Sequence, residues 1–174
     1  MAKFRIGAAV ALVALAPHPA LAEAEPPVCT AAGTLPPELS AWSMLVFRDA
    51  ATSPSALDQA RLVPGEASRV TLAPMARVTF PLHPEKTAAA DSYGGLLQLV
   101  VPARGTYRVV LGSRAWIDMV APAGQAVPSI AHTMGPACTG IRKMVDFALA
   151  PGHHTLQLSG NPTTEISVLV LRQP

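Results

Sequence analysis

The sequence has few of the features that mark the commonest functional classes. Aromatic residues account for only 5% of its positions and charged residues for 14%, so large aromatic binding faces and highly charged surfaces are not expected. The basic residues are scattered singly, and Arg142 and Lys143 form the one adjacent pair. Proteins that bind phosphate backbones carry clustered basic residues. The sequence therefore argues against binding to nucleic acid.

Catalytic motifs are also missing from the chain. The sequence contains no Gly-x-Ser-x-Gly segment, and residues 135–140 lack the lysine and hydroxyl pair of a phosphate-binding loop. Asp91, Asp118 and Asp146 are far apart in the sequence, and none has the paired carboxylate that acid–base chemistry often uses. We therefore expect a protein that works by binding or structural support, without catalysis of its own.

The first twenty-two residues have the layout of a secretory signal peptide. Lys3 and Arg5 precede an apolar run over 6–16, and small residues follow at 20–22. This run is too short for a permanent membrane anchor, and no later apolar run reaches the ~18 residues of a spanning helix. After removal of the leader, eleven basic residues balance eleven acidic ones. The sequence predicts a periplasmic or secreted protein without net charge and without a transmembrane anchor.

The chain has two cysteines, Cys29 and Cys138, and both follow the predicted leader. Export places thiols in an oxidising compartment, where an isolated pair is expected to form a disulfide. The alternatives are a lipid-modified Cys29, a thiolate pair on a metal and a free nucleophile. Pro26 and Pro27 make a poor lipidation context, and no histidine cluster accompanies the cysteines as a zinc site would require. We favour a structural bridge.

Proline and β-branched residues divide the rest of the chain into two parts. Residues 23–67 are rich in alanine and proline, which predicts a loosely ordered segment with one short helix over 37–44. Residues 68–174 alternate short apolar runs with turn residues, which predicts an all-β, antiparallel, jelly-roll-like β-sandwich. Two hairpins are expected, one pairing 69–72 with 77–80 and one pairing 96–101 with 107–111. Five further strands are expected over 115–120, 129–133, 141–149, 154–158 and 166–171.

A first candidate site is a soft-metal site. His132 and Met134 fall on one face of a predicted strand, and His154 from another strand could meet them. Imidazole and thioether are donors suited to copper, so this set predicts periplasmic copper binding. The competing interpretation is that the methionines fill gaps in the core and the histidines lie in turns.

A second candidate site is a surface for a sugar or peptide. Trp116 and Asp118 share one face of a predicted strand, and Arg114 and Tyr93 are the further residues that we assign to it. Aromatic rings with adjacent polar groups are typical of ligand-binding faces on sandwich domains. The competing interpretation is that these rings are needed in the core.

Residues 94–171 resemble two kinds of known protein. The segments that carry the resemblance are 105–109 (GTYRV), 115–118 (AWID), 138–143 (CTGIRK) and 149–152 (LAPG). They are similar to small exported proteins of Gram-negative bacteria, some of which carry the label homogentisate 1,2-dioxygenase. That label implies an iron-dependent oxidoreductase. The same span also resembles β-sandwich domains attached to secreted peptidases, which implies a non-catalytic module.

Overall fold

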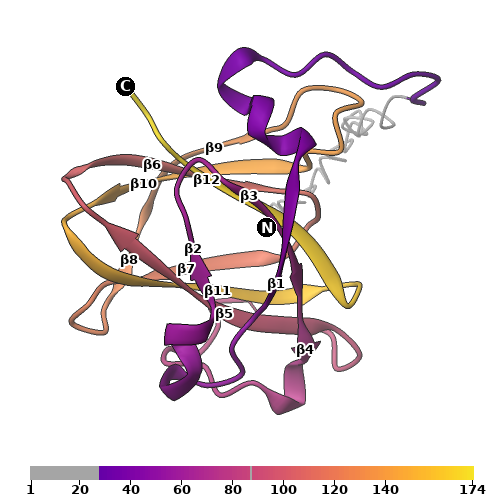
Figure 1. The fold of residues 1–174 in the computed structure, drawn as a ribbon. Coiled ribbons are helices and arrows are strands. Elements are labelled where there is room, and N and C mark those ends of the chain that lie inside the picture. The colour runs from indigo at the N-terminus through magenta and orange to yellow at the C-terminus, as the bar shows by residue number, and fades with distance from the viewer. Residues whose placement is uncertain (1–27, 87) are drawn as a thin grey trace, which may run out of the picture.

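Two stacked β-sheets make up the fold. The computed structural model describes residues 28–86 and 88–174, so the leader predicted over 1–22 lies outside the described residues. Sheet A has the strand order β1-β3-β12-β6-β10-β9, and sheet B has the order β2-β5-β11-β7-β8 with β4 also paired to β5. Sheet A lies above sheet B in Figure 1. The all-β, sandwich-like architecture predicted from the sequence is confirmed.

The strands are short and are separated by turns and 3-10 helices. The strands are β1 (Leu45–Asp49), β2 (Arg61–Leu62), β3 (Ala67–Thr71), β4 (Ala73–Pro74), β5 (Tyr93–Val101), β6 (Gly105–Leu111), β7 (Trp116–Val120), β8 (Ala126–Val127), β9 (Ser129–Met134), β10 (Lys143–Leu149), β11 (Gly152–Asn161) and β12 (Glu165–Arg172). The 3-10 helices are η1 (Pro37–Ser43), η2 (Pro54–Gln59) and η3 (Met75–Arg77). Every one of the five further strands expected after residue 112 is present, with small shifts of its ends.

The main core fills the space between the two sheets. Alternate residues of the central strands point into it, among them Val109 of β6, Leu156 of β11 and Val168 of β12, and all three are fully buried. Burial of apolar area is the dominant favourable term in folding, at roughly 25 cal/mol per Å². Polar and apolar residues alternate along these strands because every second side chain is buried in this core.

A second core covers the outer face of sheet A. Helix η1 packs its buried residues Leu39 and Trp42 against Val110, Met144 and Leu169 of three neighbouring strands. These strands are therefore apolar on both faces, as strands buried inside a structure should be. The predicted short helix over 37–44 is confirmed, in 3-10 form.

The disulfide lies beside this second core. Cys29 and Cys138 are bonded, with their Cα atoms 5.5 Å apart, as the sequence predicts. The Gly33 N–H donates to the Cys138 carbonyl at 2.7 Å, and the Trp42 indole Nε1 donates to the Thr139 carbonyl at 3.2 Å. The bridge thus fixes the start of the described chain to the loop between β9 and β10.

Both predicted hairpins are wrong. Residues 96–101 and 107–111 do form β5 and β6, but these strands belong to different sheets. The turn between them crosses from sheet B to sheet A, and the Tyr107 hydroxyl donates to the Ala103 carbonyl across it. Residues 77–80 form no strand, because the chain leaves β3 near Leu72 and enters sheet B as β4. Strand β3 pairs instead with β1 and β12.

The sheets also extend into the segment that the sequence predicts to precede the sandwich. Strands β1 and β2 lie within 23–67 and pair with β3 and β5, respectively. Prolines flank these strands rather than interrupting them, since Pro54 begins η2 and Pro64 follows β2. Both pairs are parallel, so the sheets are mixed rather than purely antiparallel.

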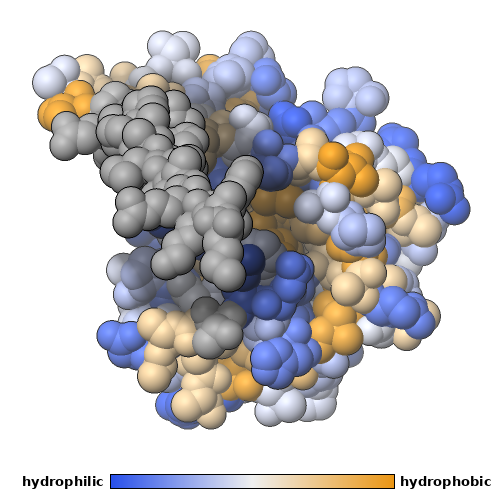
Figure 2. Space-filling model, turned by 180° about the vertical axis from the view of Figure 1, so that it is seen from behind, coloured by the Kyte–Doolittle hydropathy of each residue, from blue (hydrophilic) through white to orange (hydrophobic). Residues whose placement is uncertain are grey.

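The surface mixes polar and apolar residues. Figure 2 shows apolar side chains around a hollow on one face, between polar side chains. The most exposed large apolar residues include Phe47 on edge strand β1 and Met134 on edge strand β9. Among the described residues, no helix has the length and hydropathy needed to cross a membrane.

Candidate functional site

A pocket opens at one edge of the sandwich, where the two sheets separate. It has a volume of about 840 Å³, and we call it the intersheet pocket. Sheet B contributes β7 and β8, sheet A contributes β9 and β10, and the connection before β5 contributes two residues. The lining residues are Glu85, Lys86, Trp116, Ile117, Asp118, Met119, Ala126, Val127, Pro128, Ser129, His132, Thr133, Met134, Lys143, Val145 and Phe147.

The pocket forms there because the edge of sheet B is incomplete. Strand β8 has two residues, and they pair with Met119 and Val120 at the end of β7. The first residues of β7 have no strand beside them on that side within the described chain. Opposite them, β9 is exposed along its whole length as the last strand of sheet A. The sheets therefore leave a gap with apolar walls.

Core side chains form the walls of the pocket. Ile117 and Met119 come from sheet B, and Val145 and Phe147 come from the facing strand β10. All four also belong to the main core, so rigid sheets hold them in place.

Trp116 stands at the rim between two lysines. The Lys86 ammonium lies 5.3 Å from the ring centroid and the Lys143 ammonium 5.5 Å from it. Both distances are within the range of a cation–π contact. The indole Nε1 donates to Asp118 Oδ1 at 2.9 Å, and Asp118 Oδ2 accepts from Gln157 Nε2 at 3.2 Å. These hydrogen bonds orient the ring, and each oxygen of the carboxylate accepts one of them.

Lys143 lies on the face of β10 that points into the pocket. It is two residues from Val145 and directly opposite Met134 of β9, so these side chains share one face. The lysine is half-buried, and burial lowers its pKa from the usual 10.5 because desolvation disfavours the charged form. The charged ammonium group of Lys143 is therefore partly desolvated at the mouth of an apolar cavity.

The structure brings together half of the predicted ligand-binding set. Trp116 and Asp118 both line the intersheet pocket, whereas Arg114 and Tyr93 do not. Arg114 is exposed in the loop before β7, and Tyr93 begins β5 opposite Pro74 and packs against the main core. Lys86 and Lys143 are functional candidates that the sequence did not indicate, because a single lysine beside a strand matches no motif.

The predicted copper ligands come from two different sheets, and two of the three line the intersheet pocket. His132 and Met134 line the intersheet pocket from one face of β9. His154 lies in β11 of the other sheet, where it is buried and its Nε2 is 2.8 Å from the Ala150 carbonyl. In residues 28–86 and 88–174, no three His, Cys, Asp or Glu side chains are grouped closely enough to hold a metal ion.

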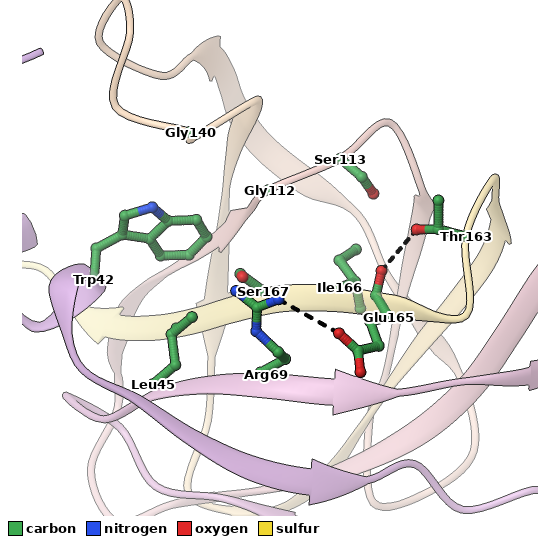
Figure 3. A pocket seen from close by; sticks show the side chains of 10 residues that line it. All are labelled: Trp42, Leu45, Arg69, Gly112, Ser113, Gly140, Thr163, Glu165, Ile166 and Ser167. Atoms are coloured by element: carbon green, nitrogen blue, oxygen red, sulfur yellow. Dashed lines mark hydrogen bonds and ion pairs between the residues drawn. The ribbon is translucent and has the colours of Figure 1, made fainter. Parts of the chain in front are cut away.

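A second, smaller pocket lies on the outer face of sheet A and has a volume of about 360 Å³. We call it the outer pocket, and Figure 3 shows it between Trp42, β3 and the start of β12. Arg69 Nη1 lies 3.4 Å from Glu165 Oε2, and the Thr163 hydroxyl donates to the Glu165 carbonyl at 2.9 Å. Its polar groups are therefore largely bonded to one another.

Comparison with known proteins identifies no related protein family or curated sequence. The two resemblances read from residues 94–171 therefore stay predictions, and the functional argument rests on the site itself.

Proposed function

We propose that this protein is an exported, disulfide-bridged β-sandwich that binds a small molecule with an apolar body in the intersheet pocket. In this proposal the protein acts by binding and carries out no reaction of its own. The observation that carries the proposal is the pocket of about 840 Å³ whose walls are core side chains of two facing sheets.

Two features support export. The sequence predicts a leader over 1–22, and the Cys29–Cys138 disulfide is of the kind that persists in oxidising compartments. A periplasmic or secreted location agrees with both.

The shape of the pocket supports binding. Sites for small molecules are typically concave, mostly apolar and of ~300–1,000 Å³, with a few polar groups that orient the ligand. The intersheet pocket has apolar walls and a polar rim that includes Lys86, Asp118 and Lys143. Because the walls belong to the core, the site exists before a ligand arrives, which lowers the entropic cost of binding.

The test uses N-phenyl-1-naphthylamine, a neutral fluorophore whose emission increases in apolar surroundings. We expect the full chain, secreted and oxidised, to bind it saturably at one site. Ser129→Phe places a ring in the pocket opposite Phe147 and should weaken binding by about tenfold, which corresponds to ~1.4 kcal/mol.

Ala131→Phe is the matched control. Ala131 lies on the same strand but opposite Asp146, on the face away from the pocket, so this variant should bind the probe like the wild type. Equal loss in both variants, or no saturable binding by the wild type, would contradict the proposal. Oxygen consumption with homogentisate and ferrous iron would instead favour the dioxygenase that the resemblance implies.

A further inference from the structure

We infer that the ligand of the intersheet pocket carries one anionic head group, which Lys143 and Lys86 bind beside the Trp116 ring. This inference rests on the proposed function, because it names the chemical class of the molecule that the same pocket takes: an amphipathic anion.

The two lysines converge on one place from different parts of the chain. Lys86 comes from the connection before β5 and Lys143 from the first position of β10, yet both ammonium groups lie within 5.5 Å of the centre of the same ring. The surroundings of this ring at the rim of the pocket therefore carry two positive charges. Such a convergence of positive charge is the complement of a negative head group.

Neither ammonium group has a counter-ion within the described part of the chain. The four ion pairs there involve arginines only. Asp118 is the nearest acid in sequence to Trp116, but its oxygens already accept hydrogen bonds from Trp116 and Gln157. Glu85 lines the pocket as an exposed side chain and makes no ion pair with either lysine.

An anion interacts more strongly with a partly buried lysine than with a fully exposed one. A charge that has lost part of its water is destabilised, and a partner of opposite sign restores the balance. Lys143 is half-buried at the mouth of the cavity, and desolvation already lowers its pKa. An anion beside Lys143 would stabilise its protonated form, and the protonated lysine would in turn attract the anion.

The side chains of the pocket walls determine which chemistry suits the body of the ligand. Ile117, Met119, Val145 and Phe147 form an apolar part of the wall, which favours a ligand with an apolar body. An apolar body with one charged end matches both parts of the site.

The test compares decanoate with 1-decanol, which share an alkyl chain and differ in the charge of the head group. Each competes with N-phenyl-1-naphthylamine on the full chain at pH 7, below the concentration at which micelles form. We expect decanoate to bind about tenfold more tightly than decanol, and added salt to narrow the difference.

Variants then assign that difference to the lysines. Lys143→Met should remove most of the preference for decanoate, measured as the ratio of the decanoate and decanol affinities within the variant, and Lys143→Arg should retain that ratio. Lys86→Met should reduce it less, because Lys86 is exposed and its charge is better screened. Arg114→Met is the control, since it removes an exposed cation that does not line the pocket.

The outcomes separate this inference from the proposed function. Equal affinity of the wild type for decanoate and decanol overturns the inference while the proposed function stands. Failure of the fluorophore itself to bind overturns the proposed function. A preference that survives in both Lys143→Met and Lys86→Met, with the variants folded as judged by circular dichroism, also overturns the inference.

Discussion

The outer pocket and the intersheet pocket differ in what their polar groups do. In the outer pocket Arg69 meets Glu165, Thr163 bonds to the backbone of Glu165, and the nearby Trp42 bonds to Thr139. In the intersheet pocket Lys86 and Lys143 contact an aromatic ring and no acid among the described residues. This difference is the reason that we place the proposed binding site in the intersheet pocket and treat the outer pocket as a packing feature.

Removal of the disulfide should give the largest loss of stability. The same variant tests whether ligand binding in the intersheet pocket depends on the region around the outer pocket. Cys29→Ala with Cys138→Ala removes a bridge between residues 109 positions apart, which should lower the free energy of unfolding by about 4 kcal/mol. The bridge adjoins the loop that carries Gly140 of the outer pocket. Urea unfolding measures the loss. Fluorophore affinity of the folded fraction should not change, and a parallel loss of affinity would break the comparison.

The ion pair of Arg108 and Asp146 should give the next largest effect. Arg108 Nε is 2.7 Å from Asp146 Oδ1 and Nη2 is 2.8 Å from Oδ2, with side-chain exposures of 25% and 12%. The hydrogen bonds raise the pKa of Arg108 above its usual value. Arg108→Met leaves a mostly buried carboxylate unpaired and should cost about 2 kcal/mol in urea unfolding.

The double variant is the control for this pair. Arg108→Met with Asp146→Leu removes both charges, so most of the lost stability should return. If the double variant is as unstable as the single one, packing of the arginine stem rather than the unpaired charge explains the loss.

Lys143 gives a smaller effect that depends on pH. Burial lowers its pKa in the folded state below 10.5, so the charged lysine destabilises the fold at neutral pH. As pH rises through the folded pKa towards 10.5, the folded protein loses this proton before the unfolded chain does, and the penalty disappears. The free energy of unfolding of the wild type, relative to Lys143→Met, should therefore rise across that window. Urea unfolding from pH 7 to 10.5 measures it.

Two controls sharpen this prediction. The difference between the wild type and Arg114→Met should not change over the same range, because arginine does not titrate there. Saturating decanoate should reduce the effect in the wild type, since an anion beside Lys143 stabilises its charged form. A pH-independent difference for Lys143→Met would show that the lysine is effectively solvated.

The Arg69–Glu165 pair of the outer pocket should give the smallest effect. The two side chains are 43% and 47% exposed and their charged atoms are 3.4 Å apart. Exposed pairs of this kind contribute about 0.5 kcal/mol or less. Arg69→Met should therefore barely change urea unfolding and should leave fluorophore affinity as it is. A clear effect on affinity would mean that the outer pocket, too, takes part in binding.

Local patterns predicted the strands well and their partners poorly. Alternation placed β7 and an apolar run after turn residues placed β12, each almost to the residue, and the oxidising context predicted the disulfide. The hairpins failed because pairing depends on contacts between distant segments. Both β5 and β6 are apolar enough to be buried on two faces, so nothing local shows that Gly105 begins a strand in the other sheet.

The site was predictable only where its chemistry stands close together in the sequence. Trp116 and Asp118 are two positions apart on one strand, and their pairing was visible from alternation. Lys86 and Lys143 reach the same ring only after β7 and β10 come together in the fold. The gap between the sheets depends on β8 having only two residues, a length that hydrophobic periodicity does not fix.

Strand β12 occupies the middle of sheet A, where it pairs with β3 on one side and β6 on the other. The segment synthesised last among the described strands is thus the one that joins the early and late halves of that sheet. Sheet A therefore cannot be completed before β12 has taken its place between β3 and β6, so the connection between the two halves of the sheet depends on this one strand.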